Sequence, residues 1–274
     1  MPCRFLFIVA LVATLLAACG GTATQPALTD PKDILAHGVS SLQGLKTVHL
    51  KGTLSGKVDP SAISGSGTGS GVTMDLSGST LEGDLDVADV EGSFKVSVPA
   101  LLGFSAELVS TGGTAYVKTS LSPDGKYHKV DTSSITSGLP LPSLPTAASP
   151  DPSAVAAAID QINAALDKLT TPPTKLADEK IGDQDCYHVQ FKVSAADMPQ
   201  ASASLGTGSV TVDVWTRKSD YRPARITLAV DAGTQGNLTA TVDFTNYDAP
   251  VTVTAPPADQ ISDQPLSLPG ILGQ

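Results

Sequence analysis

Residues 81–98 read LEGDLDVADVEGSFKVSV, and this stretch decides the fold class. Apolar and polar residues alternate one by one over 81–87 and again over 94–98. A period of two places successive side chains on opposite faces of a β-strand. The charged residues of both segments fall on one face, which leaves the other face apolar. We therefore predict neighbouring antiparallel strands with one polar and one apolar face.

The same alternation recurs along the chain. It begins at Thr47, returns over 105–120 with a break at Gly112-Gly113 that is typical of a hairpin turn, and continues in four later segments. Strands that follow one another in runs, without a helix between each pair, indicate an antiparallel sheet. We predict roughly eight to eleven strands, a range set by such runs and their turn signals. The later segments are 187–193, 210–215, 225–230 and 239–247.

Two helices are predicted beside the sheet, which makes the fold class α+β. Asp30 can cap the first helix, Pro31 suits its first turn, and apolar residues recur at positions 34, 35, 39, 42 and 45. Asp151 and Pro152 open the second helix in the same way, and its apolar positions are 155, 159, 162, 166 and 169. Pro172-Pro173 would end it. A proline-rich stretch, 139–152, and a Gly/Ser-rich stretch, 61–73, are predicted as connections.

The N-terminus has the features of an export signal. Residues 5–16 (FLFIVALVATLL) are apolar but too few to span a bilayer, which takes about 20 residues. The following Leu16-Ala17-Ala18-Cys19-Gly20 resembles a bacterial lipobox, in which the cysteine is acylated; an ordinary signal peptide is the alternative. We predict a signal peptide over 1–18, a tether over 19–29, a folded domain over 30–262 and a C-terminal tail over 263–274. Acyl chains on Cys19 would hold the domain to a membrane without spanning it.

Composition excludes two classes of partner. The 274 residues include 27 acidic and 17 basic side chains, for a net charge of −10, and the basic residues are not clustered. Nucleic acid is therefore not an expected partner, because neutralising phosphates needs a clustered basic face. A polybasic membrane patch is excluded on the same ground.

The residues that could carry chemistry are few and scattered. Cys3 leaves with the signal and Cys19 is the predicted acylation site, so Cys186 stands alone. We interpret Cys186 as a small packed residue; a nucleophile paired with His188 is the alternative. The four histidines show no metal-binding spacing, and the common nucleotide and hydrolase motifs are absent. The expectation is no enzyme: no catalytic residue, no metal ligand and no cofactor.

Several segments together resemble the LppX/LprA/LprF/LprG family of actinobacterial lipoproteins. Beyond the lipobox, the resemblance lies in KTVHLKGTLSG (46–56), ADEKIGDQDCYHVQFKVSA (177–195), VTVDVWTRKSDYRPARITLAV (210–230) and DFTNYDAPVTVTAPPAD (243–259). It implies a curved antiparallel half-barrel, similar to LolA and LolB, with helices packed on the concave face around an apolar cavity for acylated lipids or glycolipids.

The resemblance also implies a function: carrying such lipids within the cell envelope while anchored to the outer face of the bacterial plasma membrane. A membrane lipid exporter is a candidate partner. The alternative is a structural or interaction lipoprotein whose core is filled by its own side chains and which carries no lipid. The residues expected to line the cavity are Val48, Leu50, Leu54, Leu81, Leu85, Val87, Phe94, Val96, Val98, Val117, Ile159, Ile162, Val189, Phe191, Val212, Val214, Ile226 and Leu228.

Overall fold

The computed structural model describes residues 27–59, 73–130, 160–161, 163–194 and 208–264. One α-helix with described bounds, α2 (Pro31–Ser40), precedes a set of β-strands. The strands are β1 (Thr47–Val58), β2 (Met74–Asp75), β3 (Ser79–Asp86), β4 (Glu91–Val98), β5 (Phe104–Thr111), β6 (Thr114–Thr119), β7 (Tyr127–Val130), β8 (Thr174–Lys175), β9 (Glu179–Ile181), β10 (Gln184–Ser194), β11 (Ser209–Arg217), β12 (Pro223–Asp231), β13 (Gly236–Thr245) and β14 (Ile261–Ser262). Two 3₁₀ turns, η1 (Gly233–Gln235) and η2 (Ala258–Gln260), lie between the later strands.

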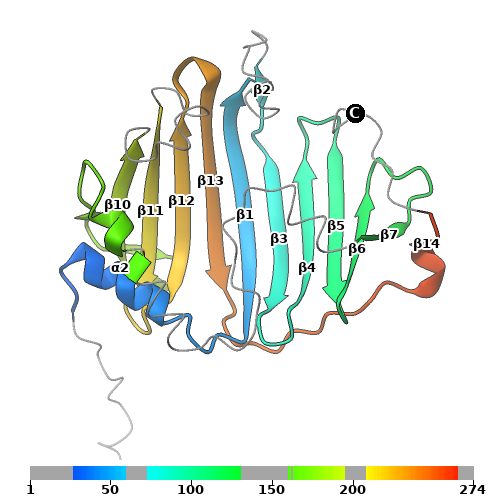
Figure 1. Cartoon of the computed structure of the whole chain (residues 1–274), viewed down its shortest axis with the longest axis horizontal. Coiled ribbons are helices and arrows are strands. Elements are labelled where there is room, and N and C mark those ends of the chain that lie inside the picture. Colours follow the sequence, from blue (N-terminus) through cyan, green and yellow to red (C-terminus); the bar gives the residue numbers. More distant parts are fainter. Residues whose placement is uncertain (1–26, 60–72, 131–159, 162, 195–207, 265–274) are drawn as a thin grey trace, which may run out of the picture.

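All fourteen of these strands belong to one open, curved sheet (Figure 1). Their order is β14-β7-β6-β5-β4-β3-β1-β13-β12-β11-β10-β8, with β2 beside β1 and β9 beside β10. The pairs are antiparallel except β14 with β7, which is parallel. The predicted open antiparallel sheet is confirmed, and the strand count exceeds the predicted range because β2, β8, β9 and β14 have only two or three residues each.

The register divides the sheet into two faces. In the central strands Lys51 lies opposite Glu82 and Asp243, whereas Leu54 lies opposite Ala240. Because side chains alternate along each strand, the polar set and the apolar set stay on opposite sides from β10 to β7. The predicted separation into a polar face and an apolar face is confirmed.

Helix α2 begins where its sequence predicts. The Asp30 carboxylate accepts the backbone N–H groups of Lys32 (2.7 Å) and Asp33 (3.4 Å), as a helix N-cap does. The helix ends at Ser40, earlier than the apolar spacing predicts. Gly44 follows in the left-handed region (φ 74°), so the chain turns there toward β1.

The hydrophobic core lies at one end of the sheet, where α2 packs on β10 and β11. Its buried members are Ile34, Leu35, Leu166, Tyr187, Val189 and Tyr221. Leu166 comes from the predicted second helix, of which residues 160–161 and 163–166 are described as helical. The rest of that helix before residue 160, the proline-rich connection, most of the Gly/Ser-rich connection and the N-terminal signal lie outside the described residues.

Candidate functional site

The predicted cavity-lining residues within the strands share the apolar face of the sheet. Val96 lies opposite Leu81 on β3 and Ala106 on β5, and Val214 lies opposite Val189 and Ile226. The structure therefore brings these residues onto one continuous surface that crosses β10, β11, β12, β13, β1, β3, β4, β5 and β6. They are Val48, Leu50, Leu54, Leu81, Leu85, Phe94, Val96, Val98, Val117, Val189, Phe191, Val212, Val214, Ile226 and Leu228.

Three predicted lining residues stand apart from this set. Val87 lies one residue beyond the end of β3, where its backbone N–H donates to Lys46 O at 2.7 Å. The strand ends there because the Asp86 carboxylate accepts the backbone N–H groups of Ala88 and Asp89 in an Asx turn. Ile159 and Ile162 lie outside the described residues.

Burial differs along the apolar face. At the α2 end, Val189 is fully buried, and Phe191 and Val214 pack against the core. Toward the centre of the sheet most of the large apolar side chains are only half-buried, and Leu228 is 41% exposed. Helix α2 contacts β10 and β11, so the apolar surface extends well past the strands that this helix covers. A half-buried aliphatic surface of this width is suited to binding apolar chains.

Three glycines lie in the middle of the same face, and neighbouring side chains cover them. Gly52, Gly83 and Gly92 lie on the apolar face of β1, β3 and β4 and are buried. A Cβ at Gly83 would lie 2.5 Å from Phe94 Cδ1, and one at Gly92 would lie 2.9 Å from Phe94 Cε2. The Phe94 ring therefore lies low against the sheet, over two positions that have no side chain. A glycine inside a strand indicates such a close approach and could have signalled it.

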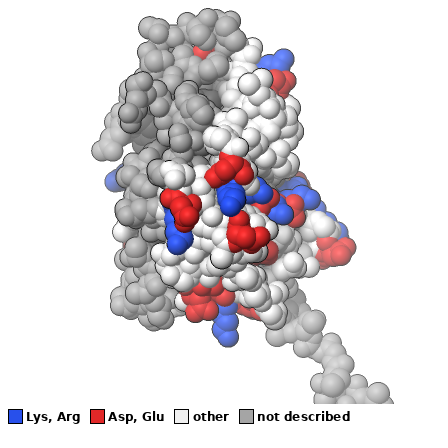
Figure 2. All heavy atoms as spheres, turned by 90° about the vertical axis from the view of Figure 1, so that its right-hand side faces the viewer, with Lys and Arg blue, Asp and Glu red and all other residues white. Residues whose placement is uncertain are grey.

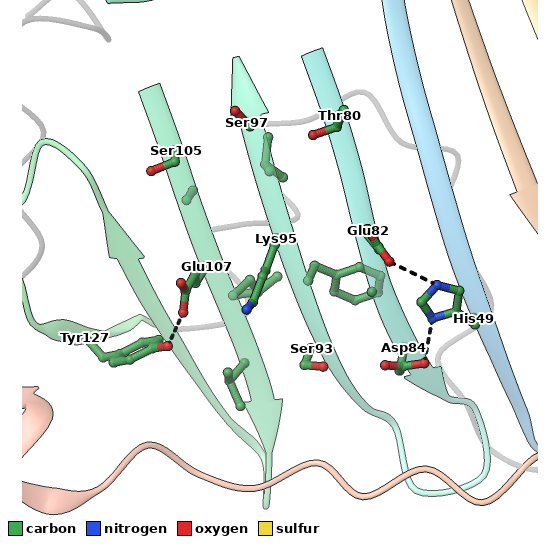
Figure 3. A pocket seen from close by; sticks show the side chains of 16 residues that line it. His49, Thr80, Glu82, Asp84, Ser93, Lys95, Ser97, Ser105, Glu107 and Tyr127 are labelled. Atoms are coloured by element: carbon green, nitrogen blue, oxygen red, sulfur yellow. Dashed lines mark hydrogen bonds and ion pairs between the residues drawn. The ribbon is translucent and has the colours of Figure 1, made fainter. Parts of the chain in front are cut away.

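The opposite face carries a polar hollow of about 740 Å³ over β1, β3, β4, β5 and β7 (Figure 3). His49 Nδ1 lies 2.9 Å from Asp84 Oδ1, and its Nε2 lies 3.6 Å from Glu82 Oε1. Lys95 lies in register between Glu82 and Glu107. Opposite charges on neighbouring strands stabilise a sheet by about 0.2–1 kcal/mol per pair. This hollow thus has a floor of polar and charged side chains and differs from the expected apolar cavity.

Tyr127 closes one side of this polar hollow (Figure 3). Its hydroxyl donates to Glu107 Oε2. Burial and the hydrogen bond to this carboxylate raise the pKa of the Tyr127 phenol to about 12, so it stays neutral at physiological pH. A neutral phenol bound to a carboxylate supplies no base and no nucleophile at that pH.

The polar face continues as paired side chains over β12 and β13 and the chain that follows β13. Arg225 donates to both carboxylate oxygens of Asp243, at 2.5 and 3.0 Å. The guanidinium groups of Arg217 and Arg222 both lie over the Tyr247 ring, 4.7 and 5.0 Å from its centre. These arginine side chains are therefore already paired with carboxylates and aromatic rings of the same chain.

Cys186 and His188 are two residues apart on β10, so the alternation places both on the same side of the strand. The geometry nevertheless gives them separate partners. The Cys186 thiol is fully buried and donates to Gln184 O at 3.5 Å, and burial raises its pKa. His188 Nε2 lies 2.8 Å from Asp213, and its Nδ1 lies 3.3 Å from Glu179. A thiol held protonated is a poor nucleophile, so packing is the better interpretation of Cys186.

Charged side chains are mixed on the described surface. Figure 2 shows acidic and basic groups beside one another on the side of the molecule that carries β7 and β14, without a broad patch of one sign. Among the described residues no group of three or more His, Cys, Asp or Glu side chains is placed to hold a metal ion. No helix in the described part of the chain is both long and apolar enough to cross a membrane.

Comparison of the fold identifies two mycobacterial proteins of similar structure. LppX, a lipoprotein of Mycobacterium tuberculosis, superimposes with a TM-score of 0.50 and 12% identity over 82% of this chain and 98% of its own. The likeness to LppX shows the fold. LprF of Mycobacterium bovis is 18% identical, with a TM-score of 0.48 over 82% of this chain and 96% of its own. No protein-family model and no curated protein sequence matches the chain.

Proposed function

We propose that this protein is a lipid-anchored carrier that binds the acyl chains of a lipid or glycolipid on the apolar face of its sheet. The observation that carries the proposal is the apolar surface itself. Strand register aligns its side chains across nine strands, and beyond β10 and β11 they are only half-buried. Burial of acyl chains contributes about 25 cal/mol per Å² of apolar surface. A bound lipid would therefore stabilise the protein by removing this apolar surface from water.

The composition of the surface supports an acyl ligand rather than an aromatic one. Its side chains are mostly Val, Leu and Ile, and the Phe94 ring lies low over Gly83 at its centre. Protein interiors are close-packed, and unfilled volume costs about 24 cal/mol per Å³. Long flexible methylene chains can follow such a shallow, uneven floor.

The anchor and the location belong to the same proposal. Acylated Cys19 would hold the domain at the outer face of a bacterial plasma membrane, within reach of a membrane lipid exporter that delivers the cargo. The fold that the chain shares with LppX, itself a lipoprotein, is consistent with this arrangement.

Mass spectrometry of co-purified lipid tests the proposal. The acylated protein is released from membranes in a mild detergent and extracted with organic solvent, and the covalent anchor stays with the protein. The extract is compared with a total lipid extract of the same membranes. We expect one acylated species enriched at close to one per protein. A lipid profile equal to that of the bulk membrane would favour the filled-core lipoprotein and contradict the proposal.

A further inference from the structure

The turn between β4 and β5 exposes two adjacent leucines. Residues 99–103 read PALLG; Leu101 is 41% exposed and Leu102 is completely exposed. No charged residue lies between Lys95 and Glu107. Single exposed apolar residues are ordinary on protein surfaces, but an adjacent pair at the tip of an uncharged hairpin is not.

The turn is ordered so that it presents these side chains outward. Three backbone hydrogen bonds close it, from Leu101 to Val98, Gly103 to Pro99 and Phe104 to Leu101, at 3.0–3.1 Å. Leu102 has φ 53°, in the left-handed region that disfavours a residue with a side chain. Glycine would fit this position without strain, so the leucine there is held in an unfavourable conformation in which its whole side chain faces solvent.

A third leucine lies at the same end of the sheet. Leu121, 36% exposed, is in the connection from β6 to β7. The preceding Ser120 exchanges hydrogen bonds with Ser105, which lies two residues after Gly103. We call Leu101, Leu102 and Leu121 the leucine tip.

The β4–β5 turn, which carries Leu101 and Leu102, and helix α2 lie at opposite ends of the strands (Figure 1). Helix α2 lies over the end where β11 finishes and the turn that contains Tyr221 leads to β12. The described chain also starts at this end, where the Leu28 N–H donates to the Tyr187 hydroxyl at 3.1 Å. Register places the ends of β1 and β4 at the far side, where the β4–β5 turn lies. The described chain therefore begins at the end remote from the leucine tip.

We propose that the leucine tip inserts into the acyl layer of a second lipid surface, one that faces the end of the protein remote from its anchor. This inference rests on the proposed carrier function, since a carrier must meet the surface that receives its cargo. A partner protein or a second copy fits less well, because a stable interface buries roughly 800 Å² on each side and the tip is a small convex point. Fluid hydrocarbon conforms to such a point and rejects charge, which the hairpin lacks.

Site-specific fluorescence tests the insertion. In the proposed processed protein Cys19 would be acylated and Cys3 removed, and Cys186 is fully buried, so Leu102→Cys would provide a single accessible thiol for an NBD label. The acylated protein is reconstituted in phosphatidylcholine vesicles, and acceptor phosphatidylcholine vesicles carrying a spin-labelled lipid are then added. We expect acceptor vesicles to quench the label at position 102.

Val90 provides the matched control. It is also an exposed apolar residue (58%) with positive φ (59°), but it lies in the turn from β3 to β4, at the opposite end of these strands from the β4–β5 turn. A label on Val90→Cys should not respond to the acceptor vesicles. Equal quenching at both positions, or none at position 102, would overturn the proposal.

A second pair of variants measures docking directly. The double variant Leu101→Ser/Leu102→Ser should capture acceptor vesicles about tenfold less well or worse, because two leucines leave hydrocarbon. Val90→Ser should capture them normally, and undiminished capture by the double variant would overturn the proposal. Co-purified lipid is measured on the same samples. If the double variant no longer captures vesicles but keeps its co-purified lipid, the leucine tip is needed for docking and not for carrying lipid. If the wild type captures vesicles but contains no co-purified lipid, the carrier function is contradicted and the insertion is not.

Discussion

At the residue scale, Asp124 connects two chain segments at one edge of the sheet. A hydrogen bond from Ser262 on β14, then the Lys126 backbone N–H and the neighbouring His128, lower the pKa of the Asp124 carboxyl to about 2. Because the folded protein lowers this pKa below its value in the unfolded chain, the contribution to stability is complete above about pH 4 and disappears between pH 4 and pH 2.

The prediction is that Asp124→Asn removes this part of the pH dependence. Thermal unfolding is followed between pH 2 and pH 7 for both proteins. The wild type should lose its advantage over the variant as pH falls from about 4 to 2, where Asp124 becomes protonated. Parallel curves for the two proteins over this range would contradict the assignment.

Cys186 gives a second prediction at this scale. Its side chain is fully buried and lacks a thiol partner among the described residues. Cys186→Ala should lower the free energy of unfolding by about 1 kcal/mol through lost packing. Lipid content by mass spectrometry should be unchanged, since the thiol lies outside the apolar face. A variant that loses bound lipid while keeping its stability would show that Cys186 has another role.

At the element scale, β4 offers a direct comparison of the two faces. Val96 lies on the apolar face and Ser97, the next residue, lies on the polar face beside the hollow. Val96→Trp should fold and lose co-purified lipid, because the indole occupies the place of an acyl chain. Ser97→Trp adds a similar bulk to the same strand and should retain the lipid.

The outcome of this pair distinguishes a lipid surface from a filled core. If the core were closed, Val96→Trp would overpack it, at about 1–3 kcal/mol, and circular dichroism with urea unfolding would show the loss. Such destabilisation at position 214 is expected in either case, because Val214 packs against the core at the α2 end. A folded Val96→Trp protein with normal lipid content would remove Val96 from the binding surface.

The sequence predicts some elements well because their causes are local. Asp30 and Pro31 mark the start of α2, since a cap and its N–H groups lie within three residues. The faces of the long strands follow from alternation, which one-sided burial imposes. The sequence predicts a longer α2 than the structure has, because Leu42 and Leu45 continue the apolar spacing. The helix ends at Ser40, and the chain then turns at Gly44.

Other features depend on contacts between distant segments and carry no local signal. Strands β8, β9 and β14 are too short for any periodicity to show, and they exist because β10 and β7 offer them an edge. The place where α2 packs depends on Tyr187 and Tyr221, which are far from it in sequence. The exposure of the apolar face likewise depends on how many strands α2 can cover, and a helix of ten residues covers two.

At the scale of the whole molecule, the sheet sets the distance between its two ends. The twelve residues of β1 span about 40 Å at a rise of about 3.3 Å each. A tether of 11 residues, 19–29, would reach about 40 Å at full extension, from the general reach of an extended chain. The β4–β5 turn thus lies about one strand length from the end of the sheet where the described chain begins, and a fully extended tether would be about as long as the sheet.

The last prediction concerns that anchor. Two acyl chains on Cys19 would bury dozens of CH₂ groups at about 0.8 kcal/mol each, whereas a single chain gives only marginal attachment. Cys19→Ala should therefore move the protein from the membrane fraction to the soluble fraction after the export signal is cut. Cys186→Ala is the matched control, because it removes a thiol and leaves the anchor; it should stay with the membrane. Fractionation by ultracentrifugation with a high-salt wash, read by immunoblot, separates the outcomes, since salt removes proteins held by charge and leaves those held by acyl chains. If Cys19→Ala remains with the membrane after the wash and its signal has been cleaved, attachment does not depend on this cysteine, and the lipobox interpretation is wrong.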